Sequence, residues 1–385
     1  MKLKKKITLS VLSVALIWTL AAAVIMVLPQ SGGAGPVRLS ELDQRRATAE
    51  AEMRRMMSSQ FVFEEDFVYP IANNQYKTKF AGKVYTGIPY TNASASGHAF
   101  FRYTTQDEEG IYHVSGANGY LVGNDCADSV FWAWATVSNT INFRGTKWMT
   151  ENYGLIKVGD YYYDMGDEHK NTKAICENNG KETMYEAYAQ LQKADAVVQY
   201  NDGAGHVMMV VETNVVYTDE GEIDGNRSHI LYLDQSGNSG VDKKASFKVL
   251  SYQGFLPFTI AEFVDESEDV EKAEVTDSLT EHNAQNLLTG TISSNYRISD
   301  VYIEITDGSD NVVQSARRYA NEEQMYEFPM AQFETGDWLW NWVPLKDIYT
   351  DFIDLSTLSG EYTCTVSVLV GTGETFTVRD FQFSV

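Results

Sequence analysis

The first pattern along the chain is an uncharged, mostly apolar run over residues 7–28, which Pro29 ends. Lysines at positions 2, 4, 5 and 6 precede it, so a positive segment leads into an apolar segment of about the length that spans a bilayer. This order is typical of an export signal and keeps the positive flank inside the cell. We therefore expect residues 1–30 to be a signal peptide or an N-terminal membrane anchor. The rest of the chain would be secreted or held at the outer face of the membrane.

A charged segment follows the apolar run. Between residues 39 and 57, leucines and methionines stand among glutamates and arginines, and Ser40 followed by Asp43 resembles a helix start. A helix here would hold the body of the protein away from the membrane. We prefer the simpler interpretation, a solvated stalk over residues 31–60.

Mixed helix-like and strand-like patterns occupy residues 61–264 without internal repeats, which predicts a folded α+β domain. A dense acidic stretch then begins and is typical of a solvated linker, over residues 265–285. In residues 286–385, alternating runs such as 301–305 are separated by glycine-containing turns. About 100 residues of short strands with regular turns indicate an all-β sandwich.

A helical repeat lies directly after one of the cysteines, Cys126. The apolar residues at helical spacing are Val130, Ala133, Trp134 and Val137. Asn124 or Asp125 is a good N-cap, which puts Cys126 in the first helical turn. There the unpaired backbone N–H groups and the helix dipole favour a thiolate, and the same N–H groups can receive an oxyanion. Cys126 is therefore a candidate nucleophile, and the alternative is a buried structural cysteine.

A nucleophilic thiol needs a base, and His206 is the strongest candidate among the six histidines. It follows a loop that contains two glycines, residues 203–205, and it opens an apolar strand over residues 207–211. The glycines allow this loop to approach another part of the chain closely. Surface positions are a sufficient explanation for three others, His98, His113 and His169.

The next apolar run covers residues 229–233 and ends at Asp234 and Gln235. A polar connection joins it to the run after His206, so the two form a plausible antiparallel hairpin. A register that pairs His206 with Asp234 also sets apolar residues opposite one another, for example Val207 and Leu233. In that register Asp234 orients His206 and stabilises its protonated form, whereas Gln235 points to the other face. A bulge that shifts the register would let Gln235 take the place of Asp234. The alternative for Asp234 is an ordinary residue at the end of a strand.

These segments resemble the NlpC-type and CHAP-type papain-like amidases and peptidases of bacterial cell walls. The resemblance covers residues 84–235 and rests on four features: Asp125-Cys126 at a helix start, Gly205-His206-Val207, the polar end of the next strand, and Gly87-Ile88-Pro89-Tyr90 upstream. It departs from the family in Ala127-Asp128, where the family usually has Ser or Thr and a small residue.

The resemblance implies a papain-like α+β fold, in which the helix that carries the cysteine packs on an antiparallel sheet. It also implies that Cys126 is the nucleophile, His206 the general base and Asp234 the third polar residue. The usual substrate of the family is the peptide of peptidoglycan, which suits an exported protein. The C-terminal region resembles the Ig-like modules of secreted bacterial proteins, most closely over residues 288–296, and would position or space the enzyme.

Composition narrows the possible partners. Without the four N-terminal lysines, the 385-residue chain has 26 basic and 53 acidic residues, a balance of −27. Such a body repels phosphate backbones, and we find no local basic patch, so we expect no nucleic-acid partner. Three cysteines are too few and too scattered for a disulfide scaffold or a Cys-rich zinc site, and we expect no metal or other cofactor. Cys364 is expected to be a buried hydrophobe, and Cys176 has no evident partner.

Three functions are consistent with these observations. The first is an exported cysteine hydrolase that cleaves amide bonds in peptidoglycan peptides. The second is a transglutaminase-like acyltransferase, since Cys, His and Asp in that order also describe that family. The third is a non-catalytic cell-surface binding protein that retains the fold, which Ala127-Asp128 and the accessory domain favour. The alternating Trp338, Trp340 and Trp342 would share a strand face, and we prefer a packing role for them to a carbohydrate platform.

Overall fold

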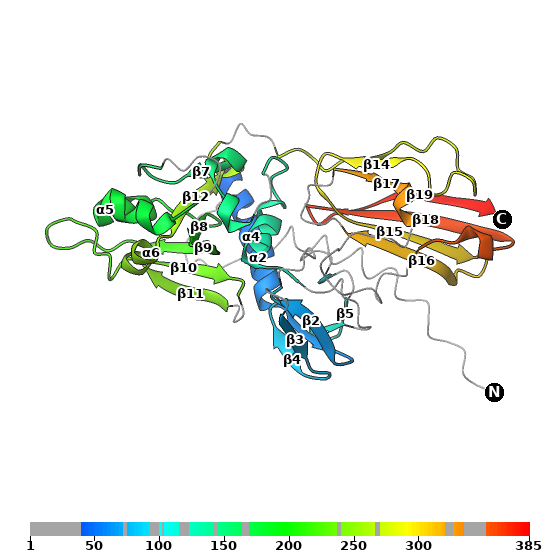
Figure 1. Ribbon diagram of the computed structural model, residues 1–385, viewed down its shortest axis with the longest axis horizontal. Coiled ribbons are helices and arrows are strands. Elements are labelled where there is room, and N and C mark those ends of the chain that lie inside the picture. The colour runs from blue at the N-terminus through cyan, green and yellow to red at the C-terminus, as the bar shows by residue number, and fades with distance from the viewer. Residues whose placement is uncertain are drawn as a thin grey trace, which may run out of the picture. The chain divides into compact units, whose positions relative to one another are not determined.

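The computed structural model describes residues 40–71, 75–91, 100–101, 104–114, 123–141, 145–163, 169–236, 240–265, 270–319, 326–334 and 352–385. The N-terminal apolar run and the three alternating tryptophans lie outside the described residues. Within them, the chain is a mixed α+β protein with four α-helices and mostly antiparallel sheets (Figure 1). Its buried apolar residues form two cores, one within residues 49–263 and one within residues 273–383. At this level the predicted α+β class is confirmed.

Helix α2 (Glu41–Ser58) belongs to the first core. It contacts helix α4 (Cys126–Trp134), and the apolar side chains of one face are buried, namely Ala49, Met53, Met56 and Met57. In the same row of the helix, one turn before Ala49, Arg46 forms a buried ion pair with Asp195 at 2.7 Å. The prediction of a solvated stalk is therefore wrong for this segment. Its apolar positions are few, but they recur every three or four residues and so form a continuous stripe that the core covers.

The central sheet has six strands in the order β11-β10-β9-β8-β12-β7, and each neighbouring pair is antiparallel. In chain order the strands are β7 (Leu155–Lys157), β8 (Ala196–Asn201), β9 (Ala204–Asn214), β10 (His229–Asp234), β11 (Gly240–Ser246) and β12 (Leu256–Ile260). Consecutive residues of β9 and β12 are buried, so both faces of the sheet are covered at its centre. Helices α4 and α5 (Thr172–Ala189) both contact β9, and α6 (Phe247–Gln253) contacts α5.

Two smaller sheets lie between α2 and α4 in the sequence. One has the order β4-β1-β6-β5 and consists of β1 (Gln60–Phe63), β4 (Val84–Thr86), β5 (Thr104–Gln106) and β6 (Tyr112–Val114). Its β1–β6 pair is parallel. The other is a two-stranded ribbon of β2 (Phe67–Ile71) and β3 (Gln75–Lys79). Strand β4 leads directly into residues 87–91, which reach the candidate site.

The C-terminal region has two antiparallel sheets, ordered β13-β14-β17 and β16-β15-β18-β19. Their strands are β13 (Val275–Asp277), β14 (Thr291–Ser294), β15 (Ile298–Asp307), β16 (Val312–Tyr319), β17 (Glu327–Pro329), β18 (Glu361–Val370) and β19 (Thr375–Ser384). Cys364 is fully buried in this second core, as predicted. Strand β13 falls inside the predicted linker, 265–285. That part of the linker prediction is wrong, because Val275–Asp277 pairs with β14 and Arg379 of β19 binds Asp277 at 2.7 Å.

Candidate active site

Cys126 is the first residue of α4, and Asp125 is its N-cap. The Asp125 side chain accepts a hydrogen bond from the Asp128 N–H at 2.8 Å, and the Asp128 carboxylate accepts one from the Asp125 N–H at 3.4 Å. This reciprocal capping box fixes where the helix begins. The predicted helix start is confirmed, and Cys126 is 5% exposed.

A tight turn places His206 near the start of β9. Asp202 and Gly203 both have positive φ, 50° and 88°, as a two-residue hairpin between β8 and β9 requires. Gly205 follows, and a Cβ at this position would overlap the Thr146 hydroxyl of the short helix η2 (Thr146–Trp148). The close approach predicted from the glycines is confirmed.

His206 Nε2 lies 2.7 Å from Asp234 Oδ1. The hairpin of β9 and β10 is also formed as predicted, but its register is not: Leu233 faces Met209 instead of Val207. The predicted register is therefore wrong by two residues at this point. Because a shift of two keeps every side chain on its face, Asp234 still lies on the side of the sheet that His206 occupies, and the diagonal distance is within reach of the two side chains.

Helix α4, which carries Cys126, contacts strand β9, which carries the histidine. The backbone N–H of Val207, the residue after His206, is near enough to the thiol to favour its charged form. Burial nevertheless raises the pKa of Cys126 above its usual range, and the carboxylates of Asp125 and Asp128 raise it further. The expectation of a lowered pKa is wrong, because burial and the two carboxylates together outweigh the backbone N–H groups, which do lower it.

Asp234 is held as a carboxylate. Burial by itself raises its pKa, but the contacts with His206 and Lys243 outweigh burial, so the pKa of Asp234 is lowered. Lys243 Nζ lies 2.7 Å from Asp234 Oδ2, and the Ser236 hydroxyl donates to the same oxygen at 3.1 Å. Asp234 therefore presents one oxygen to the imidazole while its other oxygen is bound elsewhere.

Gln235 supports the site from the opposite face. It is fully buried, and its Nε2 donates to the carbonyls of Ile88 at 3.1 Å, Pro89 at 3.2 Å and Asn124 at 3.2 Å. These bonds join residues 87–91 to the residue before the N-cap of α4. Gly123 lies at this junction with a φ of 88°. Any other residue here would also place its Cβ against the Pro89 carbonyl. The prediction that Gln235 points away from Asp234 gives no hint of this role.

Tyr90 also lies at the site. Its pKa is raised by burial first and then by nearby groups, which are Cys126, Asp125, Asp128 and Asp234. Sequence reasoning used Tyr90 only as part of the Gly-Ile-Pro-Tyr motif and assigned it no role. The Gly-Ile-Pro-Tyr motif before the cysteine was the sequence signal for this residue. The structure explains the signal, because Gln235 joins the motif to the start of α4.

The other histidines and cysteines of the described chain do not join this group. His169 is fully buried, between the Met149 carbonyl at 2.8 Å and the Tyr163 hydroxyl at 3.2 Å, so its predicted surface position is wrong. Cys176 is buried beside the Tyr188 hydroxyl, 3.9 Å from its sulfur. In the parts of the chain that the structure describes, no three His, Cys, Asp or Glu side chains are grouped to hold a metal ion.

No helix within the described ranges has both the length and the apolar character needed to cross a membrane. No protein-family model matches this chain, and no curated protein matches it.

Proposed function

We propose that this protein is an exported cysteine hydrolase that cleaves amide bonds in the peptides of peptidoglycan. The observation that carries the proposal is the 2.7 Å contact between His206 and Asp234, on a strand that the helix carrying Cys126 contacts. A thiol, an imidazole and a carboxylate in this order are the parts of an activated nucleophile. A helix that carries the cysteine and contacts an antiparallel sheet supports a papain-like assignment.

In the proposed reaction, Asp234 holds Nε2 of His206, so Nδ1 is the ring nitrogen that takes the proton from Cys126. The thiolate attacks the amide carbonyl, and the backbone N–H groups at the start of α4 receive the oxyanion. His206 then protonates the leaving amine, and water hydrolyses the thioester. Because burial raises the pKa of the thiol, the proton transfer to His206 has to accompany attack rather than precede it.

The substrate class follows from the resemblance and from the N-terminal pattern. A positive segment followed by an apolar run is typical of an export signal, and the usual substrate of the family that the chain resembles, the peptide of peptidoglycan, lies outside the cytoplasm. The C-terminal pair of sheets would serve as an Ig-like module that positions the enzyme at this polymer.

The experiment measures release of new amino groups from purified peptidoglycan by the wild-type protein and by Cys126→Ala. Cys364→Ala is the matched control, because it also removes a buried thiol but in the other core. We expect Cys126→Ala to abolish amine release at an unchanged unfolding temperature, while Cys364→Ala stays active. Equal activity of the two variants would refute the proposal. Incorporation of an amine probe into protein, without cleavage of the wall, would instead favour the acyltransferase.

One observation favours a second candidate, a non-catalytic cell-surface binding protein. Cys126 is buried and its pKa is raised, in part by Asp125 and Asp128, whereas a reactive thiol usually has a lowered pKa. The rate of alkylation by iodoacetamide at pH 7 separates the two functions. A rate at Cys126 no faster than that of an ordinary thiol, together with no amine release, would select the binding protein.

A further inference from the structure

Lys243 reaches the candidate site from the edge strand β11. Its Nζ lies 2.7 Å from Asp234 Oδ2, while Asp234 Oδ1 lies 2.7 Å from His206 Nε2. The carboxylate thus bridges the ammonium group and the imidazole. We propose that Lys243 is a positioning residue, which holds Asp234 in the orientation that serves His206 and offsets its charge. This inference rests on the His206–Asp234 pair of the proposed function.

A β-bulge in β11 turns Lys243 toward Asp234. Lys243 faces Tyr232 and Gly240 faces Asp234, so β11 has one residue more than β10 over the same interval. Asp242 lies in this interval with a φ of 52°, a left-handed conformation that few residues other than glycine adopt. A bulge of this kind bends its strand and changes the direction of the side chains beside it.

Gly240 provides the room that the Lys243 side chain uses. A Cβ at position 240 would overlap Cε of Lys243 and would lie 3.1 Å from its Cδ. The alkyl chain of Lys243 therefore lies directly on the backbone of Gly240. The Lys243 side chain is 34% exposed, and this contact restricts its motion. The contact thereby keeps the ammonium group next to the carboxylate.

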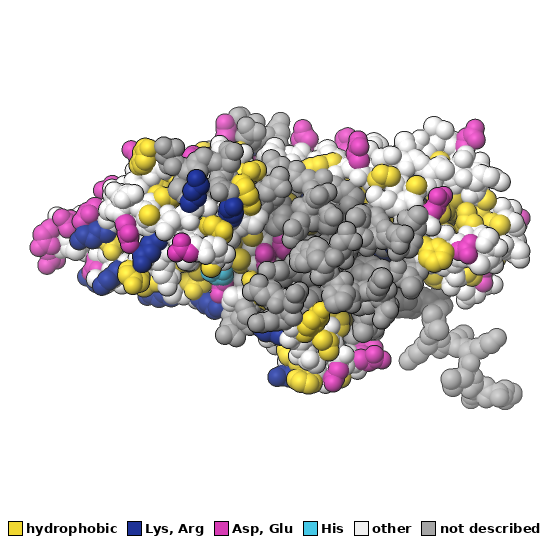
Figure 2. Space-filling model, viewed as in Figure 1, with side chains coloured by type: hydrophobic (Ala, Val, Ile, Leu, Met, Phe, Trp, Pro, Cys, Tyr) yellow, Lys and Arg dark blue, Asp and Glu magenta, His cyan; other side chains and the backbone are white. Residues whose placement is uncertain are grey.

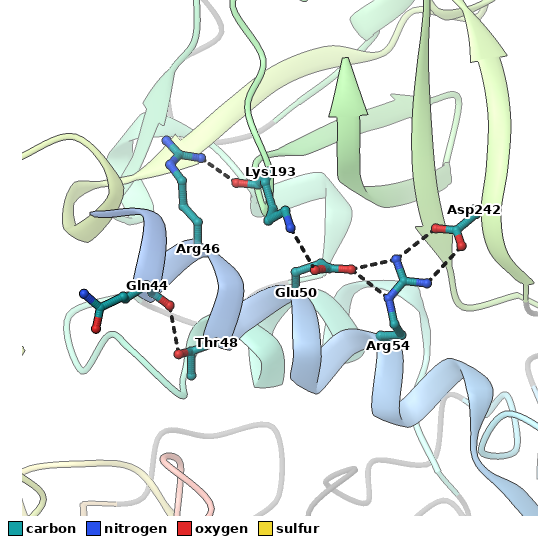
Figure 3. A network of polar contacts seen from close by, with 7 residues as sticks. All are labelled: Gln44, Arg46, Thr48, Glu50, Arg54, Lys193 and Asp242. Carbon is teal, nitrogen blue, oxygen red and sulfur yellow. Dashed lines mark hydrogen bonds and ion pairs between the residues drawn. The ribbon is translucent and has the colours of Figure 1, made fainter. Parts of the chain in front are cut away.

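Helix α2 binds the bulge at Asp242 (Figure 3). Arg54 donates to both carboxylate oxygens of Asp242, at 3.0 and 2.9 Å, and it also pairs with Glu50 at 2.6 Å. Lys193 Nζ lies 3.3 Å from the second oxygen of Glu50. A two-bond contact between guanidinium and carboxylate fixes direction as well as distance. Arg54 thus supports the bulge at the residue before Lys243.

The charge of Lys243 differs from that of its surroundings. Besides His206, two titratable groups on neighbouring segments interact with Asp234, namely Tyr90 and Tyr232, and burial raises the pKa of both so that they are neutral at pH 7. Tyr90 in turn lies near Asp125, Cys126 and Asp128. On the face shown in Figure 2, acidic and basic side chains both lie over the part that carries α5, α6 and β11, and the whole chain has a net charge of −23. An ammonium group beside Asp234 reduces the pull of the carboxylate on a second positive charge, the protonated imidazole.

The test follows the NMR titration of the His206 ring in the full-length protein with isotope-labelled histidine. A Cys126→Ala background removes the thiol, so that the imidazole titrates without it. Lys243→Met is expected to raise the titration midpoint by about one pH unit, because a cation that shares the Asp234 carboxylate with the ring is lost in a partly solvated site. Lys243→Arg keeps the charge and is expected to leave the midpoint near that of the parent protein.

Lys244→Met is the matched control, since Lys244 is the exposed neighbour of Lys243 on the same strand and faces Leu231. Equal midpoints for Lys243→Met and Lys244→Met would overturn the proposal, and so would a Lys243→Arg variant that behaves like Lys243→Met. Arg54→Gln should shift the midpoint in the same direction by a smaller amount, and a midpoint unchanged from the parent would overturn the role of Arg54.

The titration is independent of catalysis. Amine release is therefore measured on the protein with Cys126 intact. A midpoint shifted by Lys243→Met, together with no amine release by the wild-type protein, would refute the proposed function and leave the role of Lys243 standing. An active wild-type enzyme with an unchanged midpoint would do the reverse.

Discussion

Replacement of Gln235 by leucine tests whether one buried amide assembles the candidate site. Gln235 Nε2 donates to the carbonyls of Ile88, Pro89 and Asn124, and leucine has a similar size but no donor. The change therefore removes the polar link between residues 87–91 and the start of α4. We expect a less stable protein in which Tyr90 and Cys126 are no longer held in register.

The magnitude follows from the fate of the three carbonyls. Pro89 O also accepts from the Asn124 N–H at 3.2 Å, and Asn124 O also accepts from the Thr91 N–H at 3.1 Å. Those two carbonyls keep a partner, so the loss is closer to the net value of a hydrogen bond than to the full cost of an unpaired buried group. The amide has two N–H groups for the three carbonyls, so at about 1 kcal/mol for each N–H, Gln235→Leu should lower the free energy of unfolding by about 2 kcal/mol.

Urea denaturation measures this free energy, with Gln192→Leu as the control because Gln192 is exposed. Amine release from peptidoglycan is measured at a temperature where both variants are folded, and we expect it to fall at least about tenfold for Gln235→Leu. A loss below about 1 kcal/mol with full activity would refute the view that Gln235 joins the two segments.

Burial lowers the pKa of His169 to about 4, so the unfolded chain takes up this proton first as the pH falls. Stability is greatest above about pH 6.5 and should be about 3 kcal/mol lower at pH 4, an effect that His169→Gln removes in urea titrations at the two pH values. Gly123→Ala should cost more than Gly82→Ala by thermal unfolding: both glycines have positive φ, but only Gly82 has open space where the Cβ would be. Arg46→Met leaves the buried carboxylate of Asp195 unpaired and should cost about 3 to 5 kcal/mol, most of which Asp195→Leu in the same chain should restore.

Local patterns were enough to predict the start of α4 and the two strands of the hairpin. An acidic N-cap followed by apolar residues at helical spacing specifies where a helix begins, and it put Cys126 in the first turn. Alternation and turn residues in the same way specify strands such as β9 and β10. Both features depend on neighbours in sequence, so a single chain reveals them.

The register of the hairpin depended on more than the two strands. Its bulge between Leu231 and Tyr232 shifts the pairing, and β10 is also paired with β11 on its other edge. Cross-strand pairing of these two strands alone predicts that His206 lies directly opposite Asp234. His206 and Asp234 are nevertheless in contact, because a shift by two residues leaves each side chain on the same face of the sheet.

The sequence by itself determined the residue types of the site and the elements that carry them: a cysteine at a helix start, a histidine near the start of one strand and an aspartate at the end of the next. Only the tertiary structure decided their environment. Burial and the carboxylates of its own N-cap box raise the pKa of Cys126, and Lys243 of β11 meets Asp234 across a bulge. Desolvation and charge pairing depend on which distant segments come together, and helical or strand periodicity carries no information about that.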